Sequence, residues 1–79
     1  MARVLLFGRL ADIAGWRETT VQAISLFALR DTLTATDAAL GEALAGAGVQ
    51  AAVDKAIVRA DVPLTAMSEV AFLPPMSGG

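Results

Sequence analysis

The chain has 79 residues, which is enough for one small domain with a single hydrophobic core. It contains no cysteine and no histidine, and this excludes disulfides, thiolate nucleophiles, histidine general bases and the common zinc sites. The net charge is −2, the basic residues are scattered, and no apolar run approaches the roughly 20 residues of a membrane span, so we expect a cytoplasmic domain that binds neither nucleic acid nor membrane.

The N-terminal residues predict a β-hairpin with a short helix between its strands. The β-prone run Val4–Phe7 predicts the first strand, whose end lies between Phe7 and Leu10. Residues 11–14 predict a short helix closed by Gly15. The polar segment 18–23, with its β-branched residues, predicts the second strand.

The middle of the chain predicts two helices. Ser25 is placed to cap the first helix, which runs to about Leu33 and shows one apolar stripe, made by Leu26, Leu29 and Leu33. The second helix begins at Thr36 or Asp37 and ends at Gly46 and Gly48. Its apolar face is expected to consist of Leu40, Ala43, Leu44 and Ala47.

The C-terminal part predicts three further strands. Residues 51–54 and 56–59 are short strand candidates, and a turn follows at 61–63. The last strand, 69–73, is stopped by two prolines that cannot donate to a ladder. Because the first and last strands are both apolar, we expect them side by side in the middle of a mixed sheet, with the helices on one face.

The chain ends in Pro74-Pro75-Met76-Ser77-Gly78-Gly79. Six residues reach roughly 20 Å when extended, and the Pro-Pro pair favours a projecting polyproline II conformation. Glycines without a Cβ can enter a channel too narrow for other residues, and no charged side chain follows Glu69. This ending predicts a terminal carboxylate that is presented to the active site of another protein. The alternative is a frayed terminus, where small residues and prolines are common.

The most specific motif is Glu69-Val70-Ala71-Phe72-Leu73 followed by Pro-Pro and a final Gly-Gly. Together with residues 4–8, 51–53 and 63–65, it resembles the small subunits of molybdopterin synthase, a family of ubiquitin-like sulfur carriers. The resemblance covers nearly the whole chain. It implies an α+β, β-grasp fold in which a mixed sheet of about five strands packs against helices. Residues 1–73 would form the domain and residues 74–79 an extended tail.

The resemblance also implies a chemistry for Gly79. A ubiquitin-activating-like enzyme would use ATP to adenylate the Gly79 carboxylate, and sulfur transfer would then give a thiocarboxylate. The tail would enter the large subunit of molybdopterin synthase, in a heterotetramer of two small and two large chains, and deliver sulfur for the dithiolene of molybdopterin. ATP would be bound by the activating partner, so we expect this chain to bind no cofactor or metal and to have no catalytic activity of its own.

The resemblance implies a partner-binding surface at the root of the tail, where apolar family positions match Phe7, Ile57 and Leu73. The full set of expected partner-binding residues is Phe7, Ile57, Phe72, Leu73, Pro74, Pro75, Met76, Ser77 and Gly78. Phe7, Ile57 and Leu73 could instead belong to the core, since only alternate residues of a half-buried strand face inward.

Two alternative functions remain open at this stage. The carrier could serve another pathway, such as thiazole formation, cysteine synthesis or tRNA thiolation. The chain could also be a β-grasp interaction module that is never activated.

Some local features also remain open. Lys55, the single lysine, is either an isopeptide acceptor or a solvated turn residue. Ala66-Met67-Ser68 stands where relatives carry a more polar turn, and Asp54 and Asp61 are placed to pair with Lys55 or Arg59.

Overall fold

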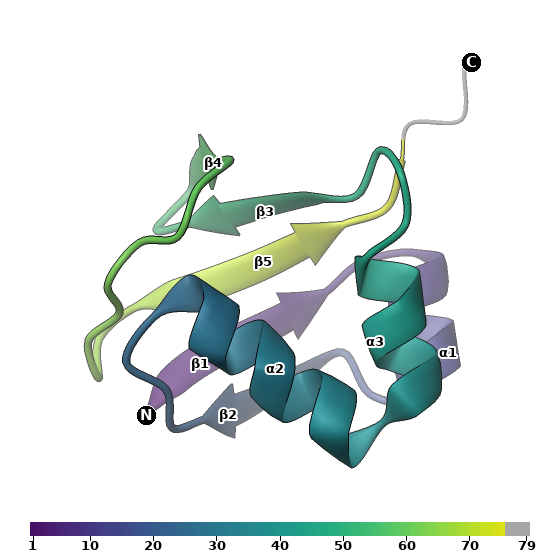
Figure 1. The fold of residues 1–79 in the computed structure, drawn as a ribbon, viewed down its shortest axis with the longest axis horizontal. Coiled ribbons are helices and arrows are strands. Elements are labelled where there is room, and N and C mark those ends of the chain that lie inside the picture. The colour runs from purple at the N-terminus through teal and green to yellow at the C-terminus, as the bar shows by residue number, and fades with distance from the viewer. Residues whose placement is uncertain (76–79) are drawn as a thin grey trace.

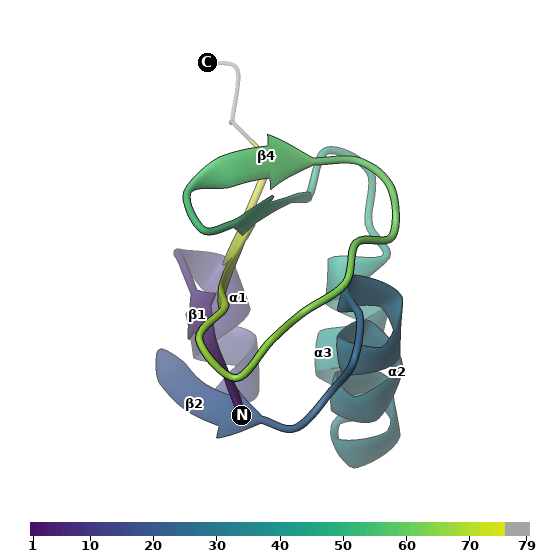
Figure 2. The ribbon, with the colours of Figure 1, turned by 90° about the vertical axis from the view of Figure 1, so that its left-hand side faces the viewer.

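The computed structural model describes residues 1–75, which form a five-stranded sheet and three helices (Figure 1). The strands are β1 (Ala2–Leu6), β2 (Glu18–Val21), β3 (Gln50–Val53), β4 (Ala56–Val58) and β5 (Glu69–Leu73). The helices are α1 (Arg9–Ala14), α2 (Leu26–Thr36) and α3 (Ala38–Leu44). Helices α2 and α3 lie on one face of the sheet, and α1 lies beyond the end of β1 beside α3 (Figures 1 and 2).

The strand order in the sheet is β2-β1-β5-β3-β4. Strands β1 and β5 are parallel, with Val4 opposite Val70 and Leu6 opposite Phe72, and the other neighbouring pairs are antiparallel. The prediction that the first and last strands lie side by side within a mixed sheet is therefore confirmed. The physical reason is that central strands bury more side-chain surface than edge strands, so the most apolar segments take those places.

The core lies between the sheet and the helices. Alternate residues of β1 and β5 face it, so Val4, Leu6, Val70 and Phe72 are buried against one another. The helices contribute one apolar stripe each, made by Leu26, Leu29 and Leu33 from α2 and by Leu40 and Leu44 from α3. The opposite face of the sheet carries no helix within the described residues (Figure 2).

The predicted caps are present. The Ser25 hydroxyl accepts a hydrogen bond from the Ala28 amide at 3.2 Å, and the Asp37 carboxylate accepts one from the Leu40 amide at 3.1 Å. Gly15 ends α1 in the left-handed conformation, with φ 82°. These three positions were predictable because a cap depends on residues that are close in sequence.

Several predicted boundaries are wrong. Strand β1 begins at Ala2 and ends at Leu6, and α1 begins at Arg9 rather than at residue 11. Helix α2 continues past Leu33 to Thr36, because the hydroxyl of Thr36 donates to the carbonyl of Thr32 at 2.9 Å and so stays satisfied within the helix. Helix α3 ends at Leu44, so the expected helical position of Ala47 is also wrong, and that residue is exposed.

In the turns before and after β4, aspartate side chains accept hydrogen bonds from backbone amides, which the composition did not reveal. Asp54 and Lys55 form the β3–β4 turn with φ values of 50° and 72°, and Lys55 is an exposed turn residue. Asp54 accepts a hydrogen bond from the Glu69 amide at 2.9 Å, and Asp61 accepts one from the Phe27 amide at 2.8 Å. Neither aspartate forms the ion pair that we expected.

The turn at 65–68 is held by two hydroxyl side chains. Ser68 is only 5% exposed, and its hydroxyl accepts a hydrogen bond from the Thr65 amide at 2.9 Å. The Thr65 hydroxyl accepts one from the Met67 amide at 3.2 Å. The Ser68 carbonyl in turn accepts from the Arg3 amide at 3.0 Å. The turn therefore joins the start of β5 to the start of β1 without the more polar sequence of the relatives.

Candidate functional site

The C-terminal segment leaves the domain at the end of β5, between the ends of its two neighbouring strands (Figure 1). Leu73 and Pro74 are half-buried, and Pro75 is exposed. Pro74 lies against Gly8 and Pro75 lies against Gly48. The predicted sites Met76, Ser77, Gly78 and Gly79 lie outside the described residues, so their roles remain predictions.

An apolar surface crosses the face of the sheet that carries no helix. Strand register aligns Leu5, Ala71, Ala52 and Ile57 in one row across β1, β5, β3 and β4. Leu73 lies one alternation further along β5, and Phe7 is beside it because its amide donates to the Phe72 carbonyl at 3.2 Å. We call this surface the open apolar face; its residues are Leu5, Phe7, Ala52, Ile57, Ala71 and Leu73.

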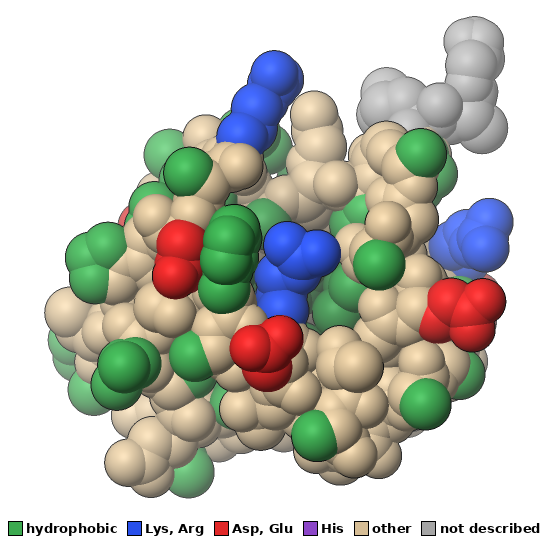
Figure 3. Space-filling model, in the orientation of Figure 1, with side chains coloured by type: hydrophobic (Ala, Val, Ile, Leu, Met, Phe, Trp, Pro, Cys, Tyr) green, Lys and Arg blue, Asp and Glu red, His purple; other side chains and the backbone are tan. Residues whose placement is uncertain are grey.

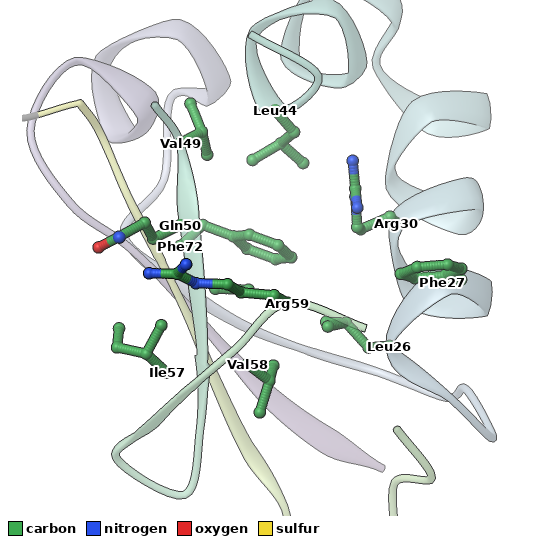
Figure 4. Close-up of a pocket in the computed structure, with 11 residues that line it drawn as sticks. Leu26, Phe27, Arg30, Leu44, Val49, Gln50, Ile57, Val58, Arg59 and Phe72 are labelled. Atoms are coloured by element: carbon green, nitrogen blue, oxygen red, sulfur yellow. The ribbon is translucent and has the colours of Figure 1, made fainter. Parts of the chain in front are cut away.

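Phe7 and Ile57 are the exposed large side chains of this face. Phe7 is 46% exposed and Ile57 is 47% exposed. In Figure 4, Ile57 points away from α2, whereas Val58 lies on the side of the helix. The structure thus brings Phe7, Ile57 and Leu73 to one side of the sheet, with Phe7 and Leu73 next to the point where the C-terminal segment leaves and Ile57 two strands away.

Phe72 requires a correction. We expected it among the partner-binding residues, but its side chain is 2% exposed and packs in the core with Leu6 and Val70. The alternation of β5 explains this placement, because Ala71 and Leu73 point to the open face and Phe72 must therefore point to the helices. We remove Phe72 from the expected partner surface.

On the other side of the sheet, a shallow groove separates α2 and α3 from β3 and β4. Its volume is about 290 Å³, and Figure 3 shows the corresponding face of the molecule. The edge of the Phe72 ring lies in it between the side chains of Arg30 and Arg59 (Figure 4). The Arg30 guanidinium is also 5.6 Å from the centre of the exposed Phe27 ring.

The described residues contain no cluster of metal-binding side chains. Within residues 1–75, no three acidic side chains come together as metal ligands, and the ion pairs found there join Arg3 to Glu18 and Glu69 across β2, β1 and β5. Among those residues, no helix has the length and the apolar composition that crossing a bilayer requires. The described features of the site are the open apolar face and the root of the tail at Pro74 and Pro75.

These features define the class of the protein. The sheet order, the parallel central pair and the helices on one face match SAMP1 from Haloferax volcanii with a TM-score of 0.87, at 24% identity over 99% of this chain and 98% of that one. The solution structure of small archaeal modifier protein 1 from Methanosarcina acetivorans matches with a TM-score of 0.88, at 22% identity over 99% of this chain and 95% of that one. The domain has the ubiquitin-like β-grasp fold.

The family follows from the sequence comparisons. The model described as the ThiS family matches residues 4–79, and the chain belongs to this family. The chain is also 37% identical, over an alignment 81 positions long, to the molybdopterin synthase sulfur carrier subunit of Escherichia coli (strain K12), and the alignment covers 100% of both chains. The resemblance noted from the sequence motifs is therefore confirmed at the level of the family.

Sequence reasoning missed two parts of the site. It did not identify Leu5, Ala52 and Ala71 as members of the open apolar face, in which Ala52 is buried and the other two are half-buried, although their places follow from strand register once the strand order is known. It also missed Gly8 and Gly48. The available signals were that Gly8 directly follows the first predicted strand and that Gly48 shortly precedes the strand predicted at 51–54. Neither position indicates a contact with a proline that is distant in the sequence.

Proposed function

We propose that this ThiS-like chain carries sulfur as a thiocarboxylate on Gly79 and acts as the small subunit of a molybdopterin synthase. The observation that carries the proposal is the full-length relationship to a sulfur carrier subunit of that enzyme. The sequence from β5 through Pro-Pro to Gly-Gly supports it, because it provides an uncharged segment that ends in a carboxylate.

The activation consists of two balanced steps. First, an oxygen of the Gly79 carboxylate attacks the α-phosphorus of ATP bound to an adenylating partner, and pyrophosphate leaves. Second, a sulfide-level donor attacks the carbonyl carbon of the acyl adenylate, and AMP leaves. The glycine residues favour both steps because no Cβ obstructs the approach to the carbonyl carbon.

In the synthase, the tail would enter the active site of the large subunit and release its sulfur to the pyranopterin precursor. A dithiolene contains two sulfur atoms, so each product requires two discharges of the carrier. The large subunit would supply the acid, base or nucleophile for the transfer. This chain contributes a docking surface and the reacting end.

The open apolar face is suited to docking both partners. One of its exposed members, Phe7, lies beside the exit of the C-terminal segment, and the other, Ile57, lies two strands away on β4, so binding there would orient the tail toward an adjacent active site. Burying such side chains contributes about 25 cal/mol per Å² of apolar surface. The same face would be used in turn by the adenylating enzyme and by the large subunit, so the two partners would exclude each other.

Mass spectrometry of the intact chain tests the proposal. The chain is incubated with its adenylating partner, ATP and a sulfide donor, and the E. coli subunit serves as a positive control. We expect the mass to rise by the difference between one sulfur and one oxygen, and a chain that lacks Gly79 should show no change. The idea of a carrier fails if the positive control gains mass and this chain does not.

The destination of the sulfur needs a separate assay. The thiocarboxylated chain is mixed with the large subunit and the pyranopterin precursor, and formation of the dithiolene is measured. Discharge there supports the proposed pathway. Stable thiocarboxylate in this mixture, with discharge instead in a thiazole-forming or tRNA-thiolating system, would assign the carrier to that other pathway.

A further inference from the structure

The exit of the C-terminal segment lies between two glycines that border the strands on either side of β5. Strand β1 is parallel to β5, so its C-terminal end lies at the exit, and Gly8 follows that end. Strand β3 is antiparallel to β5, so its N-terminal end lies there, and Gly48 precedes it. The topology therefore brings Gly8 and Gly48 to opposite sides of one point.

Both glycines are in contact with a proline of the root. A Cβ atom built on Gly8 would lie 3.0 Å from Cγ of Pro74, and one built on Gly48 would lie 2.7 Å from Cβ of Pro75. Carbon atoms that are not bonded prefer separations of about 3.5–4.0 Å. Any side chain at either position would thus push a proline ring away, most severely at Gly48, where the obstructed atom is attached directly to the backbone.

Backbone conformation alone does not account for this closeness. Gly8 has φ 58° and Gly48 has φ 85°, and both values favour glycine. Gly15 has a φ of 82°, close to that of Gly48, yet a Cβ there would meet nothing within 4 Å. The contacts with Pro74 and Pro75 are therefore a property of the exit and not of left-handed glycines in general.

We propose that Gly8 and Gly48 form a seat for the Pro-Pro root and thereby set the direction in which the C-terminal segment leaves the domain. Given the function proposed above, on which this inference rests, both glycines are positioning residues for the Gly79 carboxyl group. Proline locks its own φ angle, so seating both rings leaves little freedom between β5 and Pro75.

Beyond the seat, only residues 76–79 remain to carry the Gly79 carboxyl group. With Pro74 and Pro75 held against the domain, the four residues that follow in sequence span at most about 14 Å when fully extended. A root with a set direction lowers the ordering cost of entering a partner's channel. It also matters for the chemistry, because displacing reacting groups by about 1 Å can slow a reaction by about 100-fold.

The test compares three glycine-to-alanine variants. Gly8→Ala and Gly48→Ala introduce a Cβ into the seat, and Gly15→Ala introduces an alanine at a positive φ where no neighbour is near, so it is the matched control for Gly48→Ala. For each variant we measure the unfolding midpoint and the kcat and KM of thiocarboxylate formation by the adenylating partner. All three should lower the unfolding midpoint through the strain of a positive φ, and Gly8→Ala and Gly48→Ala should lower it at least as much as Gly15→Ala because their Cβ atoms also meet a proline.

The kinetic results should separate the variants. We expect Gly48→Ala to lower kcat by about 10-fold or more, with Gly8→Ala affected in the same direction, while Gly15→Ala stays within about twofold of the original chain. The seat is refuted if Gly48→Ala and Gly15→Ala have the same kcat. If the original chain is not thiocarboxylated at all, the proposed function has failed, and the seat must then be judged from its geometry.

Nuclear Overhauser effects in the unmodified chain provide that judgement without any variant or partner. The seat predicts cross-peaks between the α-protons of Gly48 and the ring protons of Pro75, and between those of Gly8 and Pro74. Their absence in a folded sample would overturn the inference even if every variant failed to fold.

Discussion

Replacing Phe7 by alanine tests whether the open apolar face binds a partner. Phe7 is 46% exposed, so about half of its surface is available for burial against the large subunit. Full burial of a phenylalanine side chain is favourable by about 1.5–3 kcal/mol, and half of that is about 0.7–1.4 kcal/mol. Phe7→Ala should therefore raise the Kd for the large subunit by about 3- to 10-fold.

Phe27 provides a matched control on the other side of the sheet. It is 45% exposed, lies on α2 and borders the groove instead of the open apolar face. Because the two side chains bury similar fractions of their surface, Phe7→Ala and Phe27→Ala should lower stability to a similar extent. Titration calorimetry with the large subunit should nevertheless show weaker binding for Phe7→Ala alone. Equal weakening by both variants would refute the assignment of the interface, and so would unchanged binding by Phe7→Ala.

Four further substitutions test the structure by denaturant unfolding. Phe72→Ala should lower the free energy of unfolding by about 3–5 kcal/mol, because the side chain is 2% exposed; a cost near that of Phe7→Ala would place it at the surface instead. Lys55→Gly should raise stability by about 1 kcal/mol by relieving a φ of 72°, whereas Asp54→Gly should not, since it also removes the carboxylate that accepts from the Glu69 amide. Ser68→Ala should cost about 1–3 kcal/mol by leaving the Thr65 amide without its hydroxyl partner, and a neutral effect would show that this hydrogen bond contributes nothing.

Local features of the sequence were sufficient for much of the fold. Ser25, Asp37 and Gly15 were identified as helix ends because each acts on backbone groups within a few residues. The same applies to the prolines that end β5. The adjacency of β1 and β5 is a long-range property, but it was predictable because both segments are apolar and a central place in the sheet suits them.

Predictions failed where the deciding contact was distant or where two local signals were equally good. Phe72 and Leu73 were both assigned to the partner surface, although alternation along β5 places neighbouring residues on opposite faces. Which of the two faces the helices depends on the tertiary structure, and it is Phe72. Likewise, the apolar pattern that was assigned to a longer helix included Ala47, but the chain left the helix at Leu44 to enter β3.

From sequence alone one could therefore determine the order of the elements and the family to which the chain belongs, whereas the chemistry of the Gly-Gly segment remains a prediction. The tertiary structure decided which apolar side chains remain exposed and how the root of the tail is held. Gly8 and Pro74 lie near opposite ends of the chain, and they meet because β1 and β5 pair in parallel. A contact of this kind depends on the packing of the whole sheet, so no periodicity or motif around either residue can reveal it.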